Sequence, residues 1–139
     1  MLAKLHERLR REEGFTLIEL LVVMIIIGIL VAVAVPSYLS LRGRAHKSAA
    51  ESDLRALIPD IESYYSDNNT YTGIDVATLK ASYDQSINTA GPPGPTYVVS
   101  GGTDIDYCAS VEESGQVAKK DGPDEPVVAG DSATVPPCT

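Results

Sequence analysis

Few side chains in this chain could carry out chemistry, and one of them lies in an unusual setting. Glu19 is the one charged residue between Phe15 and Val35, a stretch in which Thr16 is the only other polar residue. A charged side chain in hydrocarbon costs several kcal/mol unless it is paired. We therefore expect Glu19 to have a positively charged partner.

The two cysteines, Cys108 and Cys138, both lie in the distal half of the chain. In an exported protein they would form one disulfide, whereas in the cytosol they would stay free thiols. Two cysteines without a nearby histidine do not make a zinc site. The side of the membrane on which the distal half lies therefore decides their chemistry.

A second cluster of reactive groups is acidic and consists of Asp121, Asp124, Glu125 and Asp131. Carboxylates near glycine suit calcium, but the spacing is not that of an EF-hand loop. We interpret the cluster as an acidic surface loop. Asp121, Asp124 and Glu125 are kept as minor calcium candidates, and the main prediction is that no metal is bound.

The sequence contains no recognisable catalytic set. Its only histidines are His6 and His46, and it has no G-x-S-x-G, P-loop or G-x-G-x-x-G motif. The formal net charge of −8 argues against a nucleic-acid binder, which needs a Lys/Arg surface. We predict a protein that is not an enzyme, needs no cofactor and has no specific nucleic-acid partner.

The element that holds Glu19 is long enough to cross a membrane. A helix over the 21 residues from Phe15 to Val35 spans about 30 Å at about 1.5 Å per residue. Four basic residues precede it: Lys4, Arg8, Arg10 and Arg11. They place the N-terminal side in the cytoplasm. Composition alone leaves two interpretations: a secretory signal cut after Ala32-Val33-Ala34, or an uncleaved anchor.

The residues Gly14-Phe15-Thr16-Leu17-Ile18-Glu19 resemble the processing site of type IV prepilins and pseudopilins. The resemblance covers about Lys4 to Tyr71. It implies that a membrane-embedded prepilin peptidase cuts between Gly14 and Phe15 and methylates the new N-terminus. Residues 1–14 would be a leader peptide, and residues 15–36 would be kept as a transmembrane and filament-core helix.

The same resemblance supplies a partner for Glu19. Cleavage would create a positive amine at Phe15, and in the family this glutamate neutralises the N-terminal amine of a neighbouring subunit. The alternative is a side chain that extends to the lipid headgroups. Gly28 and Pro36 match positions between which the helix melts in several filaments of the family.

Two features of the distal half also gain a meaning from the resemblance. A bond between Cys108 and Cys138 would resemble the C-terminal disulfide loop of many pilins and would pin the tail to the head. Major pseudopilins of type II secretion bind calcium in a late loop, which is why the acidic cluster is kept as a candidate.

We predict an α+β fold, in which a long N-terminal helix packs against a small antiparallel sheet. The helix is expected from Phe15 to about Ser66, and residues 37–139 are expected to form the head. In the second half of the helix, apolar side chains recur at steps of three and four: Leu39, Ala45, Ala49, Leu54, Leu57, Ile58, Ile61 and Tyr65. A short helix is expected within Asp75–Tyr83, capped by Asp75 or Thr78. Strands are expected over Thr96–Ser100, Ile105–Val111, Gln116–Lys119 and Pro126–Ala129.

The main functional hypothesis is a structural subunit of a type IV pilus-like surface filament. Its partners would be other copies of the subunit, the prepilin peptidase, and the pilus assembly machinery of the inner membrane. The subunit would be stored in the cytoplasmic membrane and then move into an extracellular filament. The alternatives are a pseudopilin of a type II secretion or DNA-uptake system, and a secreted or anchored domain of unknown activity.

Overall fold

The computed structural model describes residues 15–89 and 94–138. The predicted leader, with His6 and Gly14, lies outside the described residues, as do residues 90–93 and Thr139. The chain divides into two units, residues 1–39 and 40–139, and each is described by itself.

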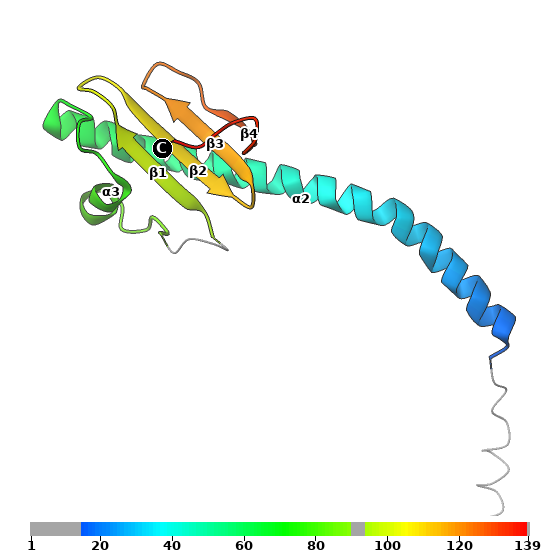
Figure 1. Cartoon of the computed structure of the whole chain (residues 1–139). Coiled ribbons are helices and arrows are strands. Elements are labelled where there is room, and N and C mark those ends of the chain that lie inside the picture. Colours follow the sequence, from blue (N-terminus) through cyan, green and yellow to red (C-terminus); the bar gives the residue numbers. More distant parts are fainter. Residues whose placement is uncertain (1–14, 90–93, 139) are drawn as a thin grey trace, which may run out of the picture. The chain divides into compact units, whose positions relative to one another are not determined.

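Helix α2 (Leu17–Asn68) is the long helix expected from the sequence (Figure 1). It ends where the run Asp67-Asn68-Asn69 predicts, because Asn69 adopts a left-handed conformation with a φ of 55°. The backbone N–H of Asn69 still donates to the carbonyl of Tyr65, at 2.7 Å. The helix therefore closes with a hydrogen-bonded last turn.

Only part of the predicted apolar face of α2 is buried. Its buried residues are Ala50, Leu54, Leu57 and Ile61, at the three- and four-residue steps of one helix face. The predicted face was wrong at its start: Leu39 is 59% exposed and Ala45 is also exposed. The buried face begins later because the head covers the helix only from about His46 onward.

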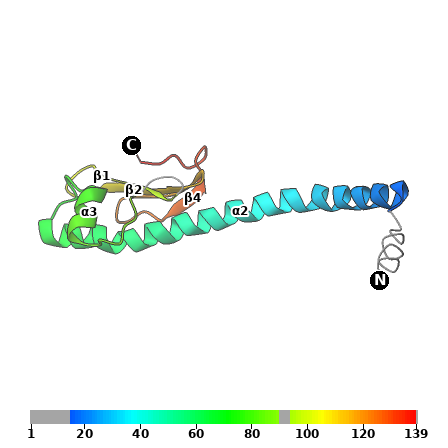
Figure 2. The ribbon, with the colours of Figure 1, turned by 90° about the horizontal axis from the view of Figure 1, so that it is seen from below.

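Four strands form one antiparallel sheet in the order β1-β2-β3-β4. The strands are β1 (Thr96–Gly101), β2 (Tyr107–Glu113), β3 (Gln116–Asp121) and β4 (Val128–Asp131). Figure 2 shows the sheet almost edge-on beside α2. The α+β prediction is confirmed. Two of the strands, β2 and β4, begin two residues later than predicted, because Ile105 lies in an exposed turn and residues 122–127 form a loop.

The core lies between the inner face of the sheet and α2. Val99, Ala109, Val111 and Ala118 meet the buried residues of the helix. Three tyrosines extend this core to the end of α2, because Tyr71 stacks on Tyr65 at 4.5 Å and lies 4.8 Å from Tyr107 between ring centroids. Burial, followed by a hydrogen bond to Glu62, raises the pKa of Tyr71 to about 12.

A short helix, α3 (Val76–Ser82), lies between α2 and the sheet in the chain order. Asp75 is its N-cap, as predicted, and its Oδ1 accepts a hydrogen bond from the N–H of Thr78 at 2.7 Å. This bond lowers the pKa of the Asp75 carboxyl. Leu79 anchors the helix in the core.

The C-terminal segment covers part of the outer face of the sheet. Cys138 is joined to Cys108 of β2 by a disulfide, with 5.9 Å between the two Cα atoms. The N–H of Cys138 donates to Oγ of Ser110 at 3.0 Å, and both Ser110 and Val117 are buried on this face. The tail therefore buries residues on the outer face of the sheet, in a second and smaller packed layer.

Gly101 lies where two backbone segments meet. A Cβ at this position would collide with the carbonyl oxygen of Tyr71, a backbone atom that cannot move aside like a flexible side chain. Gly102, the next residue, has ordinary space, with its nearest atom 3.9 Å from such a Cβ. Substituting Gly101 and Gly102 in turn therefore tests whether the Tyr71 backbone packs against the end of β1.

We expect Gly101→Ala to lower the free energy of unfolding by about 2–3 kcal/mol, because the Tyr71 backbone must shift. Gly102→Ala should change it by no more than about 0.5 kcal/mol. Urea unfolding of the full-length protein in detergent, followed by tyrosine fluorescence, measures both. Equal stability of the two variants would show that Tyr71 and Gly101 do not meet in this way.

Candidate assembly site

The N-terminal end of α2 is organised by Thr16 and Glu19. Both the N–H and the hydroxyl of Thr16 donate to Oε2 of Glu19, at 2.8 and 2.7 Å. In return, the N–H of Glu19 donates to Oγ1 of Thr16 at 3.3 Å. This reciprocal pair is a capping box, which satisfies N–H groups that the first turn of a helix leaves without partners.

The capping role of Thr16 was not predicted from the sequence, although its signal was present. Thr-x-x-Glu at the start of an apolar run is the sequence pattern of a capping box. From the sequence, Glu19 was assigned to a neighbour's amine or, as the alternative, to the lipid headgroups, and in neither case to its own helix. Both intrachain bonds use Oε2, and within the described residues Oε1 of Glu19 accepts no hydrogen bond. One carboxylate oxygen therefore remains available for a donor from another molecule.

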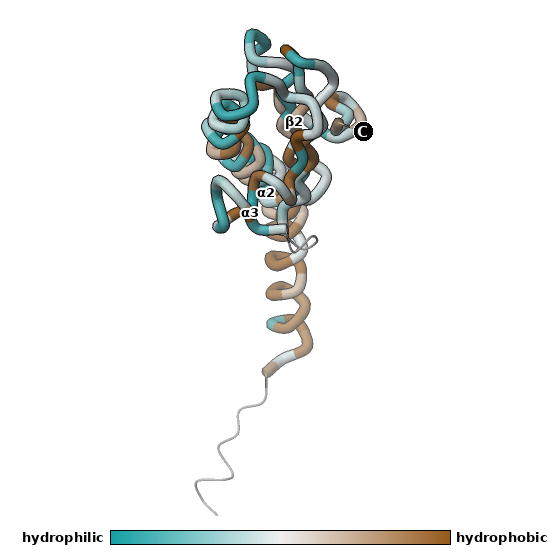
Figure 3. Tube along the Cα trace, turned by 90° about the vertical axis from the view of Figure 1, so that its left-hand side faces the viewer, coloured by the Kyte–Doolittle hydropathy of each residue, from teal (hydrophilic) through white to brown (hydrophobic). Residues whose placement is uncertain are grey.

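The helix surface that follows is apolar on every side. The large apolar side chains from Phe15 to Val35 are all at least 46% exposed in the single chain. Figure 3 shows this hydrophobic run along the N-terminal part of α2. By length and composition, the helix contains a segment able to cross a membrane, none of which is buried within the described residues. A surface of this kind needs a membrane or other protein chains to cover it.

Gly28 and Pro36 both lie inside the continuous helix α2. Pro36 has no N–H to donate to the carbonyl four residues earlier, and a Cβ at Gly28 would meet nothing within 4 Å. The hydroxyl of Ser37 donates to the carbonyl of Val33 at 3.2 Å. Melting between Gly28 and Pro36 is expected of an assembled filament, and it stays a prediction.

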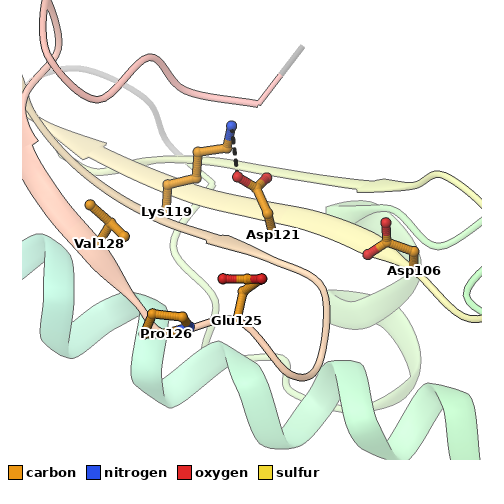
Figure 4. Close-up of a pocket in the computed structure, with 6 residues that line it drawn as sticks. All are labelled: Asp106, Lys119, Asp121, Glu125, Pro126 and Val128. Atoms are coloured by element: carbon orange, nitrogen blue, oxygen red, sulfur yellow. Dashed lines mark ion pairs between the residues drawn. The ribbon is translucent and has the colours of Figure 1, made fainter.

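The acidic loop after β3 borders a hollow of about 360 Å³ (Figure 4). Its lining residues are Asp106, Lys119, Asp121, Glu125, Pro126 and Val128. Asp121 forms an ion pair with Lys119 at 3.1 Å. The structure thus brings two of the three calcium candidates, Asp121 and Glu125, to one hollow, whereas Asp124 does not line it.

A lysine holds this loop from the inside. Lys120 is only 7% exposed, and its Nζ donates to the carbonyl oxygens of Pro123 and Glu125, at 2.8 and 2.5 Å. Sequence analysis missed this role because Lys119 and Lys120 look alike in the sequence. The pairing register separates them: Lys120 lies opposite Ala109, whose side chain faces the core.

The side-chain carboxylates of the loop do not converge on a point. Within the described residues, one group of three possible metal ligands has its ligand atoms within 4.8 Å of one another, namely Cys108, Asp121 and Cys138. Both of those sulfur atoms are in the disulfide. Asp124 and Glu125 do not join Asp121 in such a group, so the geometry offers calcium no ready set of side chains.

A family model described as the prokaryotic N-terminal methylation motif matches residues 9–35. This range contains the whole of the Gly14–Glu19 stretch and the apolar run. The capping box and the exposed helix therefore lie in the part of the chain that the family model describes.

Similar proteins extend the match into the head. The type IV wide pilus major component PilA4 of Thermus thermophilus is 34% identical over 107 residues, 77% of this chain and 78% of that protein. The type II secretion system core protein G of Aeromonas hydrophila is 37% identical over 90 residues, 63% of this chain and 59% of that protein. The type IV major pilin protein PilA of Myxococcus xanthus is 42% identical over 62 residues, 45% of this chain but only 28% of its own length.

The long apolar helix, the sheet head and these matches define the class: the chain belongs to the type IV pilin and pseudopilin family. The names of these relatives describe components of pili and of secretion systems rather than enzymes.

We expect Cys108→Ser and Cys138→Ser each to lower the stability of the protein by about 3–4 kcal/mol, because the bond closes a separation of 30 residues. The double variant should lose no more than either single variant, since all three lack the same bond. Urea unfolding and protease sensitivity of the full-length protein in detergent measure the effect.

Ser110→Ala is the matched control for the tail. It removes the hydrogen bond to the Cys138 N–H but keeps the disulfide, so it should cost only about 1 kcal/mol. A control variant as sensitive to protease as Cys138→Ser would show that the disulfide is not what holds the tail.

Proposed function

We propose that this chain is the structural subunit of a type IV pilus-like surface filament, made as a precursor and cut between Gly14 and Phe15. The observation that supports it best is the fully exposed apolar helix that begins with a capping box at Thr16 and Glu19. Such a helix is useful when it is stored in a membrane and later covered by copies of itself. A prepilin peptidase, the assembly machinery of the inner membrane and other subunits are the partners that this function requires.

Processing would change the charge at the start of the helix. In the precursor the nitrogen of Phe15 is a peptide amide, and after cleavage it is a positively charged amine. The hydrogen bonds of the capping box use the N–H and hydroxyl of Thr16, which cleavage leaves intact. Cleavage would therefore add a cation at the helix start without removing the cap.

Assembly would then bring that amine to the Glu19 of a neighbouring subunit. A carboxylate and an amine are each costly to bury alone, and pairing them lowers the cost. Oε2 of Glu19 serves its own helix, while Oε1 can accept a hydrogen bond from the amine. The pairing would also fix how far one helix is displaced along another, because each amine must reach one carboxylate.

A pseudopilin of a type II secretion system is the second candidate, because the match to core protein G of Aeromonas hydrophila covers 63% of this chain. The calcium loop expected of major pseudopilins distinguishes the two. Here Lys120 already bonds two carbonyls of the late loop, and Lys119 pairs with Asp121. A loop held by lysines supports the pilus subunit over the pseudopilin.

N-terminal sequencing of the mature protein tests the processing step. We expect the mature chain to begin at Phe15, because the apolar helix must be retained for assembly. A start at Val35 would identify a secretory signal, and a start at Met1 would identify an uncleaved anchor. Gly14→Val should leave the precursor uncut in the membrane, because a small residue suits a tight peptidase site. Normal cleavage of that variant would contradict the proposed processing.

Glu19→Gln tests the assembly step. Glutamine serves in a capping box as glutamate does, so the helix start should be kept while the charge is lost. The neighbour's amine would be buried with a neutral partner, at a cost of about 3–5 kcal/mol per contact. We expect normal cleavage and a sharp fall in the yield of filaments sheared from cells, measured by immunoblot.

Thr16→Val provides the matched control, since it keeps the carboxylate and removes the hydroxyl of the cap, at a cost of about 1 kcal/mol. Filament yield should fall far less than in Glu19→Gln. Wild-type yield from Glu19→Gln, or an equal loss from both variants, would assign Glu19 to the cap or to the lipid headgroups rather than to a neighbour's amine.

A further inference from the structure

The basic residues of the head are distributed unevenly along the chain. Residues 40–50 contain three basic residues, Arg42, Arg44 and Lys47, and no acidic residue. Residues 51–139 contain four basic and fifteen acidic residues, a net charge of −11. About three turns of helix are therefore strongly positive, and residues 51–139 are strongly negative.

The three basic side chains, here called the basic collar, form no ion pair with an acidic residue within residues 15–89 and 94–138. Arg42 and Arg44 are exposed and Lys47 is half-buried. Among the described residues, Lys119 forms an ion pair with Asp121 and His46 contacts Glu113, and neither contact includes a collar residue. The positive charge of the collar is therefore open to another molecule.

A hydrogen-bond relay orients the first collar residue. Nε of Arg42 donates to Nε2 of His46 at 3.3 Å, and Nδ1 of His46 lies 3.1 Å from Oε1 of Glu113 on β2. Because Nε2 is the acceptor, neutral His46 carries its proton on Nδ1 and donates it to Glu113. The relay ties the collar to the sheet through Nε of Arg42, and within the part of the chain that the structure describes the terminal nitrogens of Arg42 donate no hydrogen bond.

The acidic surroundings of the relay lie on the head rather than on the collar. Asp53 follows on α2, and burial, together with the charge of Glu113, raises the pKa of its carboxyl. Burial and the nearby Asp53 likewise raise the pKa of Tyr97 to about 12. Negative charge is therefore crowded where β2 and β1 meet this part of α2.

The width of the head forces copies to be staggered. Packed helices lie about 8–10 Å apart, whereas four strands spaced about 4.8 Å apart already span about 14 Å before side chains are counted. Chains packed through their apolar helices with their heads on the same side therefore cannot place those heads at one level. A displaced neighbour brings its head beside the helix segment that precedes the first buried residue, Ala50, and that segment is the collar.

We propose that the basic collar of Arg42, Arg44 and Lys47 is a docking surface for the acidic head of a second copy of this chain. The proposal rests on the filament function proposed above. Charge complementarity between the positive segment and residues 51–139, which have a net charge of −11, supports it. The collar would select the stagger at which helices pack, while the apolar helices supply most of the energy.

The first test is the double variant Arg44→Glu with Lys47→Glu, which leaves the Arg42 relay in place. Its matched control is Arg55→Glu with Lys80→Glu, which changes the net charge equally but on the acidic part of the chain. We expect the collar variant to reduce filament yield about tenfold and the control about twofold or less. Both variants should reach the membrane at wild-type level with a mature N-terminus at Phe15. Equal yields from the two variants would overturn the proposal.

The second test identifies the partner. Filaments assembled from a mixture of ¹⁴N- and ¹⁵N-labelled subunits are treated with a carbodiimide, which joins lysine amines to nearby carboxylates. We expect hybrid-mass cross-links from Lys47 to acidic peptides within residues 51–139 of another copy. Cross-links from Lys47 that stay within one isotope would overturn the proposal.

A collar that binds lipid headgroups instead would behave differently. Hybrid cross-links from Lys47 would be absent. Trypsin cleavage after Lys47, in full-length protein reconstituted in vesicles, would fall when phosphatidylglycerol replaces phosphatidylcholine. That result would overturn docking between copies while leaving the filament function intact, whereas a wild-type strain without filaments would overturn both.

Discussion

The apolar surface of residues 15–35 is the constraint on which the rest of the molecule depends. Sixteen large apolar side chains are exposed there, and burying one such side chain is worth about 1.5–3 kcal/mol. The sum far exceeds the several kcal/mol that one buried carboxylate costs. The helix therefore stays covered whether it carries Glu19 or not, and the membrane and a bundle of similar helices are two covers of the same kind. Moving the helix from the membrane into a bundle of similar helices changes the buried apolar area little. Polar groups therefore decide how the helices pack against one another.

Glu19 is the polar group best placed for that decision, because its carboxylate caps its own helix with one oxygen and, in the proposed filament, would bind a neighbour's amine with the other. The capping box consumes Oε2 and needs only residues of the same chain. Hydrocarbon offers no donor for the other oxygen, so a neighbouring amine is worth more there than it would be in water. In the proposed filament, a charge that costs energy in the membrane would thus give direction to assembly, since the cost would be relieved when the neighbour is correctly displaced.

Local sequence patterns predicted the helices and strands well, but they did not predict contacts between residues far apart in the sequence. The end of α2 at Asn69, the cap of α3 at Asp75 and the four strands all follow from turn residues and side-chain alternation. The buried ammonium of Lys120 depends on which residue of β3 faces the core, and hence on the pairing with Ala109 of β2. The close approach of Gly101 to Tyr71 depends on how two distant segments meet. Thr16 is the exception. Its capping box follows from the local pattern Thr-x-x-Glu and could have been predicted, but Glu19 was considered only as a charge to be neutralised.

Two internal features stabilise the head, a buried lysine and a disulfide, and neither involves the basic collar. Lys120 holds the late loop by donating to two of its backbone carbonyls, and the disulfide fixes the tail over the outer face of the sheet. Lys119 and Lys120 contact the acidic cluster of their own chain. Within the described residues, the three basic residues of the collar make no ion pair with that cluster. Exposed ion pairs within one chain add little stability, while the same charges placed between chains select partner and register. The separation of positive charge beside the apolar helix from negative charge on the head therefore fits a chain whose neighbours must recognise it at one fixed displacement.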